Sequence, residues 1–212
     1  MQPVFRNLLI LVISFFTCIA NGTIMDDIVG DARVRNEKKA LVEWVMENAH
    51  YKTGKFAMTP DKAAKIVENA YFNGAVEGVD PLLVLAVAKT ESGFRSNISS
   101  NAGAKGMMQV IPKYHKEKLQ SRDPYRVSVS IEVGTKIIKE YLSTSNNNTR
   151  KALDKYSGGA KQYYTKVSRT HKSISKHLVE YAFANELPIY AVHSIEKPII
   201  NKERQIVMVA AR

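Results

Sequence analysis

Residues 79–112 read VDPLLVLAVAKTESGFRSNISSNAGAKGMMQVIP. The segment 82–90 is apolar on every side except at Lys89, which predicts a helix surrounded by other elements. Gly93 is well placed to end this helix. Glu91 therefore lies at the C-terminal end of a buried helix, beside a loop that contains glycine. A lone acid in this position indicates a site of proton transfer.

The surroundings predicted for Glu91 favour the protonated form of its carboxyl. The C-terminal end of a helix carries partial negative charge, and apolar neighbours disfavour a carboxylate. Both effects raise the pKa of the carboxyl, as a general acid that works near neutral pH requires. An isolated glutamate is more often solvated or capping, so the prediction depends on the rest of the chain.

Helices are predicted on both sides of this stretch, because apolar residues recur at helical spacing. Thr59 followed by Pro60 is typical of a helix start, and so is Asp80 followed by Pro81. The predicted helices cover residues 36–51, 59–78, 113–119, 129–142, 150–155 and 160–176. Residues 21–35 are polar and small, which predicts a linker. No strand-period pattern occurs between residues 36 and 176, so the body of the chain is predicted to be all-α.

The composition describes a basic globular protein. The chain has 212 residues, of which 45% are hydrophobic, which favours one domain with extensions. Lys and Arg number 31 against 20 Asp and Glu, for a net charge of +11. Such a surface attracts polyanions, namely nucleic acid, anionic lipid or an acidic wall polymer, and charge alone does not choose among them.

The first 22 residues have the pattern of a secretory signal peptide. Residues 8–20 follow Arg6 and are almost wholly apolar, and small residues occur at the end of this run, at Ala20, and just after it, at Gly22. The apolar run is short for a membrane span, and an uncleaved anchor is the alternative. The single cysteine, Cys18, lies inside this segment, so thiol catalysis is excluded from the rest. The expected location is the periplasm or cell envelope, where nucleic acid is not an expected partner.

Two segments carry a family resemblance. Residues 91–94 read ESGF, and residues 100–112 read SNAGAKGMMQVIP. They closely resemble the catalytic region of soluble lytic transglycosylase (SLT) domains, which carry Glu-Ser and then Ser-x-x-Gly-Ala-x-Gly-Leu-Met-Gln-x-x-Pro. Residues 156–159 (YSGG) are similar to the later Tyr-Asn-Ala-Gly element, and residues 130–134 (SIEVG) to the Asn-Ile-x-x-Gly helix. The ordered agreement over about residues 67–170 is more specific than any single motif.

The match has two departures. Met107 stands where the family has Leu, which conserves volume. Ser157 and Gly158 stand where the family has Asn and Ala, which leaves any contact of that Asn side chain unsupported in this chain. Tyr156 is retained.

The resemblance implies a lysozyme-like, goose-type α-fold that cleaves the bond between N-acetylmuramic acid and N-acetylglucosamine in peptidoglycan. By analogy, Glu91 first protonates the glycosidic oxygen, and the substrate's own N-acetyl group stabilises the sugar cation. Glu91 then takes the proton from the C6 hydroxyl, which gives a 1,6-anhydro sugar. The analogy implies no cofactor, and one carboxylate suffices.

Roles for other residues follow from the same analogy. Ser100 is expected to hydrogen-bond the N-acetyl group or the acid, and Tyr156 to hydrogen-bond Glu91 or the sugar. Gln109 is expected to contact sugar, and Met108 to pack under the cleft. Backbone or supporting roles are expected for Ser92, Gly103, Gly106, Gly134 and Ser157, and Gly106 also lets a glycan approach the main chain.

The implied domain division has four parts. Residues 1–22 form the signal peptide or anchor, 23–58 the linker and N-terminal helix, 59–178 the catalytic domain, and 179–212 a C-terminal extension. The extension has two β-branched runs and is expected to form a hairpin or a basic tail that orders on a partner.

Alternatives remain open from the sequence. Glycosidases that use two protein carboxylates need a second acid. The later acids Glu117, Asp123, Glu132 and Asp154 carry no comparable motif and are interpreted as surface or capping residues. One of them near Glu91 in space would allow a hydrolysing muramidase. A peptidoglycan-binding protein without turnover is the non-enzymatic alternative, which the intact Glu91 disfavours. Wall remodelling, secretion or conjugation machines, and phage entry or release all use such domains.

Two further features have simple interpretations. The five histidines show no metal-ligand spacing, so no metal site is predicted. The basic cluster over residues 169–177 is interpreted as a solvated face, and anionic envelope polymer or a membrane surface is its alternative partner.

Overall fold

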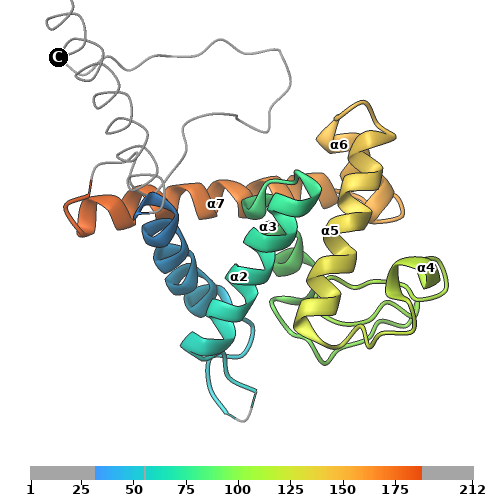
Figure 1. Cartoon of the computed structure of the whole chain (residues 1–212), viewed down its shortest axis with the longest axis horizontal. Helices are drawn as coiled ribbons and strands as arrows, with labels where there is room; N and C mark the ends of the chain where they lie inside the picture. The colour runs from blue at the N-terminus through green and yellow to red at the C-terminus, as the bar shows by residue number, and fades with distance from the viewer. Residues whose placement is uncertain (1–31, 55, 188–212) are drawn as a thin grey trace, which may run out of the picture.

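The computed structural model describes residues 32–54 and 56–187, and these residues are mostly helical (Figure 1). A first helix covers residues 32–48. It is followed by α2 (Pro60–Glu77), α3 (Pro81–Ser92), α4 (Lys116–Leu119), α5 (Val127–Ser143), α6 (Thr149–Tyr156) and α7 (Tyr163–Ala184). The described residues contain no strand, only two isolated bridges, Ser99 with Lys105 and Lys105 with Val110. The predicted all-α class is confirmed.

The helix starts follow local capping chemistry. The Thr59 hydroxyl accepts a hydrogen bond from the Lys62 amide at 3.3 Å, and Pro60 occupies the first turn of α2. One oxygen of Asp80 accepts from the Leu82 amide at 2.9 Å and begins α3. Both starts agree with the sequence-based expectation, because a cap needs only residues that are close along the chain.

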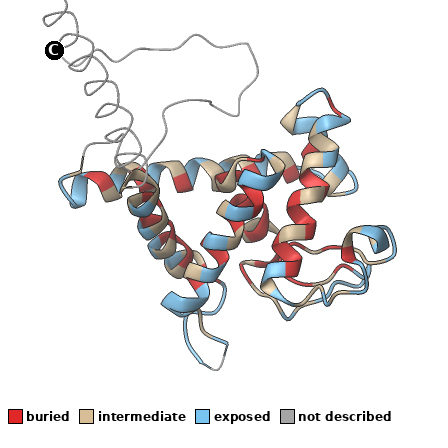
Figure 2. Cartoon of the chain, viewed as in Figure 1, coloured by how far each residue is buried: buried red, intermediate tan, exposed pale blue. Residues whose placement is uncertain are grey.

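One hydrophobic core holds the helices together. α3 packs on α7 and on α2, α2 packs on α5, and α5 packs on α6 (Figure 1). Residues 82–88 of α3 are all buried, as their apolar sequence predicts. The buried positions of the other helices lie on the faces turned toward one another (Figure 2). α3 therefore runs through the core, and Glu91 lies near the C-terminal end of this helix.

Some predicted boundaries are wrong. Residues 32–35 are helical although their polarity predicts a linker, and the first helix ends at residue 48. Leu41, Trp44 and Val45 of this helix belong to the same core cluster as α3, so it packs as part of the body. Burial of these side chains stabilises the helix in a way that local polarity does not reveal.

The last helix also differs from its prediction. α7 begins at Tyr163, because Gly158 and Gly159 have positive φ and form a turn before the helix. It continues to Ala184, past the predicted helix end at residue 176, because Leu178 and Ala182 are buried. The predicted signal segment, residues 1–22, and residues 188–212 of the predicted extension lie outside the described residues.

The predicted basic face of α7 is only partly solvated. Arg169, Lys172 and Lys176 are exposed. The two histidines point to other elements, since His171 Nε2 lies 2.9 Å from an oxygen of Asp80 and His177 Nε2 lies 3.0 Å from the Ala40 carbonyl. Within residues 32–54 and 56–187, no helix is long and apolar enough to cross a membrane.

Candidate active site

Glu91 occupies the last turn of α3 and is half-buried. Gly93 ends the helix with φ of 60°, a left-handed conformation that glycine adopts without strain. The Tyr163 hydroxyl, at the first residue of α7, donates a hydrogen bond to Glu91 Oε1. The packing of α3 on α7 thus brings an acid and a phenol together from residues 72 positions apart.

The protonation of this pair follows from burial. Burial raises the pKa of the Glu91 carboxyl above its usual value, and the hydrogen bond from Tyr163 offsets part of that rise. Burial and the nearby Glu91 raise the pKa of the Tyr163 hydroxyl, so the phenol keeps its proton and remains a donor. Among the described residues, no second carboxylate contributes to the shift at Glu91. The site is built around one acid.

Met108, which Tyr156 contacts, is fully buried. Its amide donates to the Ser130 hydroxyl at 3.0 Å, and its carbonyl accepts from the Tyr156 hydroxyl at 2.8 Å. A Cβ on Gly134 of α5 would lie 2.7 Å from Met108 Cβ. The loop after α3 is therefore clamped onto α5 and α6 at Met108, where only glycine allows α5 to approach so closely.

Tyr156 does not hydrogen-bond Glu91, which was one of the two partners expected for it. Its hydroxyl donates to the Met108 carbonyl, and its ring stacks on that of Tyr163 with centroids 6.5 Å apart and planes 17° apart. Tyr156 is the last residue of α6, and Tyr163 is the first of α7. Tyr163, which lies outside the compared motifs, is therefore the tyrosine that contacts the acid. Tyr156 packs against the Tyr163 ring.

The glycine-bearing loop is held by its own hydrogen bonds. The Ser100 side chain is exposed, and its hydroxyl accepts from the Ala104 amide at 3.1 Å. Gln109 has a φ of 48°, and its Nε2 donates to the Gly106 carbonyl at 2.8 Å. A Cβ on Gly106 would lie 2.0 Å from the Pro124 carbonyl oxygen. Ser100 and Gln109 thus shape the loop, and Gly106 is required where the loop meets residue 124.

The remaining predicted supporting residues have local partners. The buried Ser92 hydroxyl donates to the Ala88 carbonyl at 3.1 Å. The Ser157 hydroxyl donates to the Asp154 carbonyl at 3.1 Å and accepts from the Ala160 amide at 3.2 Å, so it holds the turn between α6 and α7. Gly103 has a φ of 84° with open space around it.

Sequence reasoning missed two residues of the site, Tyr163 and Ser130. The sequence pattern places Tyr163 in the interior of a basic helix, and no spacing signal links it to Glu91. Ser130 lies within the segment compared with the family's Asn-Ile-x-x-Gly helix, so its position was available from that comparison. The buried Ser130 hydroxyl accepts a hydrogen bond from the Met108 amide, which explains why a small polar side chain occurs there.

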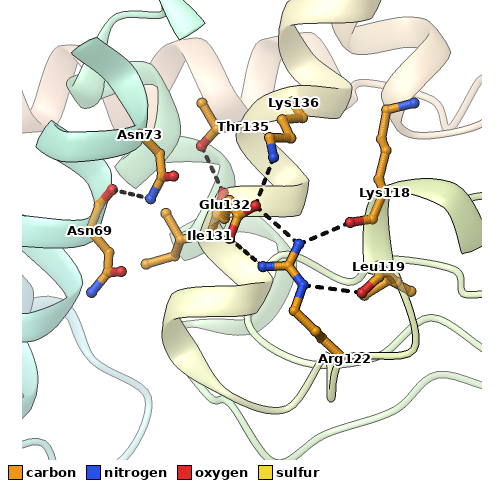
Figure 3. A network of polar contacts seen from close by, with 9 residues as sticks. All are labelled: Asn69, Asn73, Lys118, Leu119, Arg122, Ile131, Glu132, Thr135 and Lys136. Atoms are coloured by element: carbon orange, nitrogen blue, oxygen red, sulfur yellow. Dashed lines mark hydrogen bonds and ion pairs between the residues drawn. The ribbon is translucent and has the colours of Figure 1, made fainter. Parts of the chain in front are cut away.

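The other acids have structural partners or are exposed. Glu132 accepts two hydrogen bonds from Arg122, at 2.6 and 3.0 Å, and one from Lys136 at 2.7 Å (Figure 3). These cations lower the pKa of Glu132 to about 2. Asp123 accepts from the Tyr125 amide at 2.9 Å and caps a turn. Glu117 and Asp154 are exposed. In the part of the chain that the structure describes, no group of three or more His, Cys, Asp or Glu side chains is arranged to hold a metal ion.

A family model and a solved structure relate this chain to known proteins. The model of the Transglycosylase SLT domain family matches residues 69–179, just over half of the chain. Among solved structures, an inactive mutant of the lytic transglycosylase Slt from Pseudomonas aeruginosa is 19% identical with a TM-score of 0.44. The alignment covers 64% of this chain and 25% of that one, so the chain spans about a quarter of that enzyme's length. The expected resemblance is confirmed: the chain belongs to the transglycosylase SLT domain family.

Proposed function

We propose that the chain is a peptidoglycan lytic transglycosylase that cleaves the bond between N-acetylmuramic acid and N-acetylglucosamine. The observation that carries the proposal is the single half-buried carboxyl of Glu91, whose pKa is raised and which a tyrosine hydroxyl holds in place. Membership of the SLT domain family supports peptidoglycan as the substrate class. The signal-peptide pattern of residues 1–22 supports an exported protein of the periplasm or cell envelope.

In the proposed reaction, Glu91 acts first as an acid and then as a base. Its carboxyl donates a proton to the glycosidic oxygen as the bond to the muramic C1 breaks. The N-acetyl carbonyl of the substrate stabilises the positive charge at C1. The Glu91 carboxylate then takes the proton of the C6 hydroxyl, whose oxygen bonds to C1. One carboxyl thus ends the cycle in its starting protonation state, and no water is consumed.

The neighbours of Glu91 suit this double role. Burial favours the protonated acid at the start, and the Tyr163 hydroxyl stabilises the carboxylate in between. The Ser130 hydroxyl binds the Met108 amide, and the Tyr156 hydroxyl binds the Met108 carbonyl. These two hydrogen bonds keep Met108, the proposed floor of the cleft, at a fixed position relative to Glu91. Roles in binding sugar for Ser100, Gln109 and the glycines remain part of the proposal.

Product analysis tests the chemistry directly. Peptidoglycan digested by the purified protein is expected to yield fragments that end in 1,6-anhydro-muramic acid, which are lighter by one water than the hydrolysed equivalents. Mass spectrometry of the fragments distinguishes the two. Reducing muramic ends without the anhydro product would identify a hydrolysing muramidase instead, and retention of peptidoglycan without any cleavage would identify a binding protein.

Tyr163→Phe is expected to lower the cleavage rate by about 10- to 100-fold, because the carboxylate loses a positioned donor. The hydrogen bond lowers the pKa of Glu91, so its removal is expected to move the Glu91 limb of the pH–rate profile to higher pH. Rates measured across pH for the variant and for Tyr164→Phe, whose ring lies under Arg150, provide the comparison. An unshifted profile with a wild-type rate would contradict the assignment of Tyr163.

Glu132→Gln is expected to leave the cleavage rate within about twofold, because Arg122 and Lys136 hold this carboxylate in a structural network. The loss of these part-exposed ion pairs is expected to cost about 1 kcal/mol in the free energy of unfolding at neutral pH. Since the folded pKa of Glu132 is lowered to about 2, this contribution is present above pH 4.5 and fades as the pH falls toward 2. Urea unfolding at several pH values measures it; a rate loss of about a hundredfold or more would make Glu132 a second catalytic acid.

A further inference from the structure

α3 packs on α7, and a polar contact joins the two helices at each end of their interface. At one end Tyr163, the first residue of α7, donates to Glu91 in the last turn of α3. At the other end His171 Nε2 lies 2.9 Å from Oδ2 of Asp80, the residue that caps the start of α3. The two contacts are eight residues apart on α7, or about 12 Å of helix. The helices therefore run in opposite directions and are fixed to each other at two separate points.

Apolar packing accompanies these two contacts. One face of α7 carries residues that are three or four positions apart, namely Tyr163, Val167, His171 and Ile174. Val167 and Ile174 are buried and belong to the same core cluster as residues 82–88 of α3. Apolar burial holds two helices together, but it has no direction and does not by itself fix how one helix slides or pivots on the other. Hydrogen bonds are directional, so a pair of them at opposite ends defines the placement.

The Asp80 carboxylate serves both helices. Its Oδ1 accepts from the Leu82 amide at 2.9 Å and starts α3, while its Oδ2 faces His171. A carboxylate only accepts hydrogen bonds, so His171 donates through Nε2–H, in the neutral Nε2–H tautomer and in the protonated ring alike. Burial raises the pKa of Glu37 in the first helix and of Tyr71 in α2, and the nearby Asp80 adds to both shifts. Since Asp80 lies beside a second carboxyl group, a donor stabilises it, and His171 supplies that donor.

We propose that His171 is a positioning residue of the candidate active site, which sets α7 on α3 so that the Tyr163 hydroxyl meets Glu91. The inference rests on the proposed function and adds to it a residue that does not touch the acid. A group that binds a reacting carboxyl must be held to within about 0.5 Å, so a small pivot of α7 weakens the contact. Without the His171 hydrogen bond, apolar packing, including the stack on Tyr156, is what remains to place Tyr163.

α7 offers a matched control, because it carries a second histidine of similar exposure. His177 Nε2 lies 3.0 Å from the Ala40 carbonyl, and its side chain is 17% exposed against 20% for His171. His177 thus ties α7 to the first helix rather than to α3. Replacement of either histidine by phenylalanine is expected to lower the urea midpoint of unfolding, but only the change at residue 171 is expected to affect Glu91.

The first test titrates the Glu91 carboxyl in the full chain. Carboxyl-labelled glutamate is followed by carbon NMR, and Glu91→Gln identifies the signal. Since the Tyr163 hydrogen bond lowers the pKa of Glu91, His171→Phe is expected to raise this pKa by about half or more of the rise in Tyr163→Phe. In the Tyr163→Phe background His171→Phe is expected to add nothing, because both changes act through the same hydrogen bond. His171→Gln keeps a donor and is expected to restore the wild-type titration, and His177→Phe is expected to leave it unchanged.

Asp80→Ser removes the same contact from the other side. A serine hydroxyl caps the start of α3 but is too short to reach His171 as well, so the same rise in the pKa of Glu91 is expected. The absence of a rise in both His171→Phe and Asp80→Ser would overturn the positioning role. An equal rise in His177→Phe, or a rise that persists in the Tyr163→Phe background, would overturn it as well.

The second test measures cleavage. His171→Phe is expected to cleave peptidoglycan about 5- to 10-fold more slowly than wild type, since the donor to Glu91 is misplaced rather than lost. His177→Phe is expected to cleave at the wild-type rate. A coupled Glu91 titration in a protein that cleaves no peptidoglycan would support the positioning role and refute the proposed function. Cleavage by the wild-type protein, with an unchanged Glu91 titration in His171→Phe, would refute the positioning role alone.

Discussion

Glu91→Gln is expected to reduce peptidoglycan cleavage by about 10³-fold or more, because the amide replaces a group that both donates and accepts the reacting proton. The substitution conserves shape and keeps an acceptor oxygen for Tyr163, so the fold is expected to persist. Muropeptide release, followed by mass spectrometry, measures the rate. Glu117→Gln, at an exposed position on α4, is the matched control and is expected to behave as wild type. Undiminished wall cleavage by the Glu91 variant would make the catalytic assignment wrong.

The same variant has an expected signature in stability. Burial raises the folded-state pKa of Glu91 above 4.5, so the folded protein holds this proton more tightly than the unfolded chain does. The contribution of Glu91 to the free energy of unfolding is therefore fully present below pH 4.5 and falls as the pH rises through the raised pKa. Glutamine does not titrate, so Glu91→Gln removes this decrease of the free energy of unfolding with rising pH. At neutral pH the variant is expected to be at least as stable as wild type, and a less stable variant with the same pH slope would contradict the burial argument.

Gly106→Ala is expected to cost at least about 3 kcal/mol in the free energy of unfolding or to prevent the loop from docking. The new Cβ would lie 2.0 Å from the Pro124 carbonyl oxygen and 3.0 Å from the Ser130 hydroxyl, and φ is already +75°. Because Ser130 holds the Met108 amide, the displacement is also expected to disturb the cleft floor and reduce cleavage.

Gly103→Ala provides a control that separates backbone strain from steric collision. Gly103 has a φ of +84°, but a Cβ added to it would meet no atom within 4 Å. Strain alone is expected to cost about 1 kcal/mol at this position. Thermal or urea unfolding of both variants gives the comparison. Equal losses of stability would show that the close approach of residue 124 contributes nothing.

Much of the fold is local in origin and was predictable. The starts of α2 and α3 depend on Thr59 and Asp80, whose caps bind amides two or three residues away. The buried run of α3 and its end at Gly93 follow from the periodicity and composition of one segment. Boundaries set by burial were less predictable, and so the first helix and the end of α7 extend beyond their local signals.

The sequence by itself determined that Glu91 ends a buried helix before a glycine-bearing loop, since that arrangement depends on neighbours along the chain. Only the tertiary structure decided which groups meet the acid. Tyr163 reaches Glu91 because α7 packs on α3, while Tyr156 turns to the Met108 carbonyl. Contacts between residues that are distant along the chain arise from how helices pack, and no local spacing encodes them.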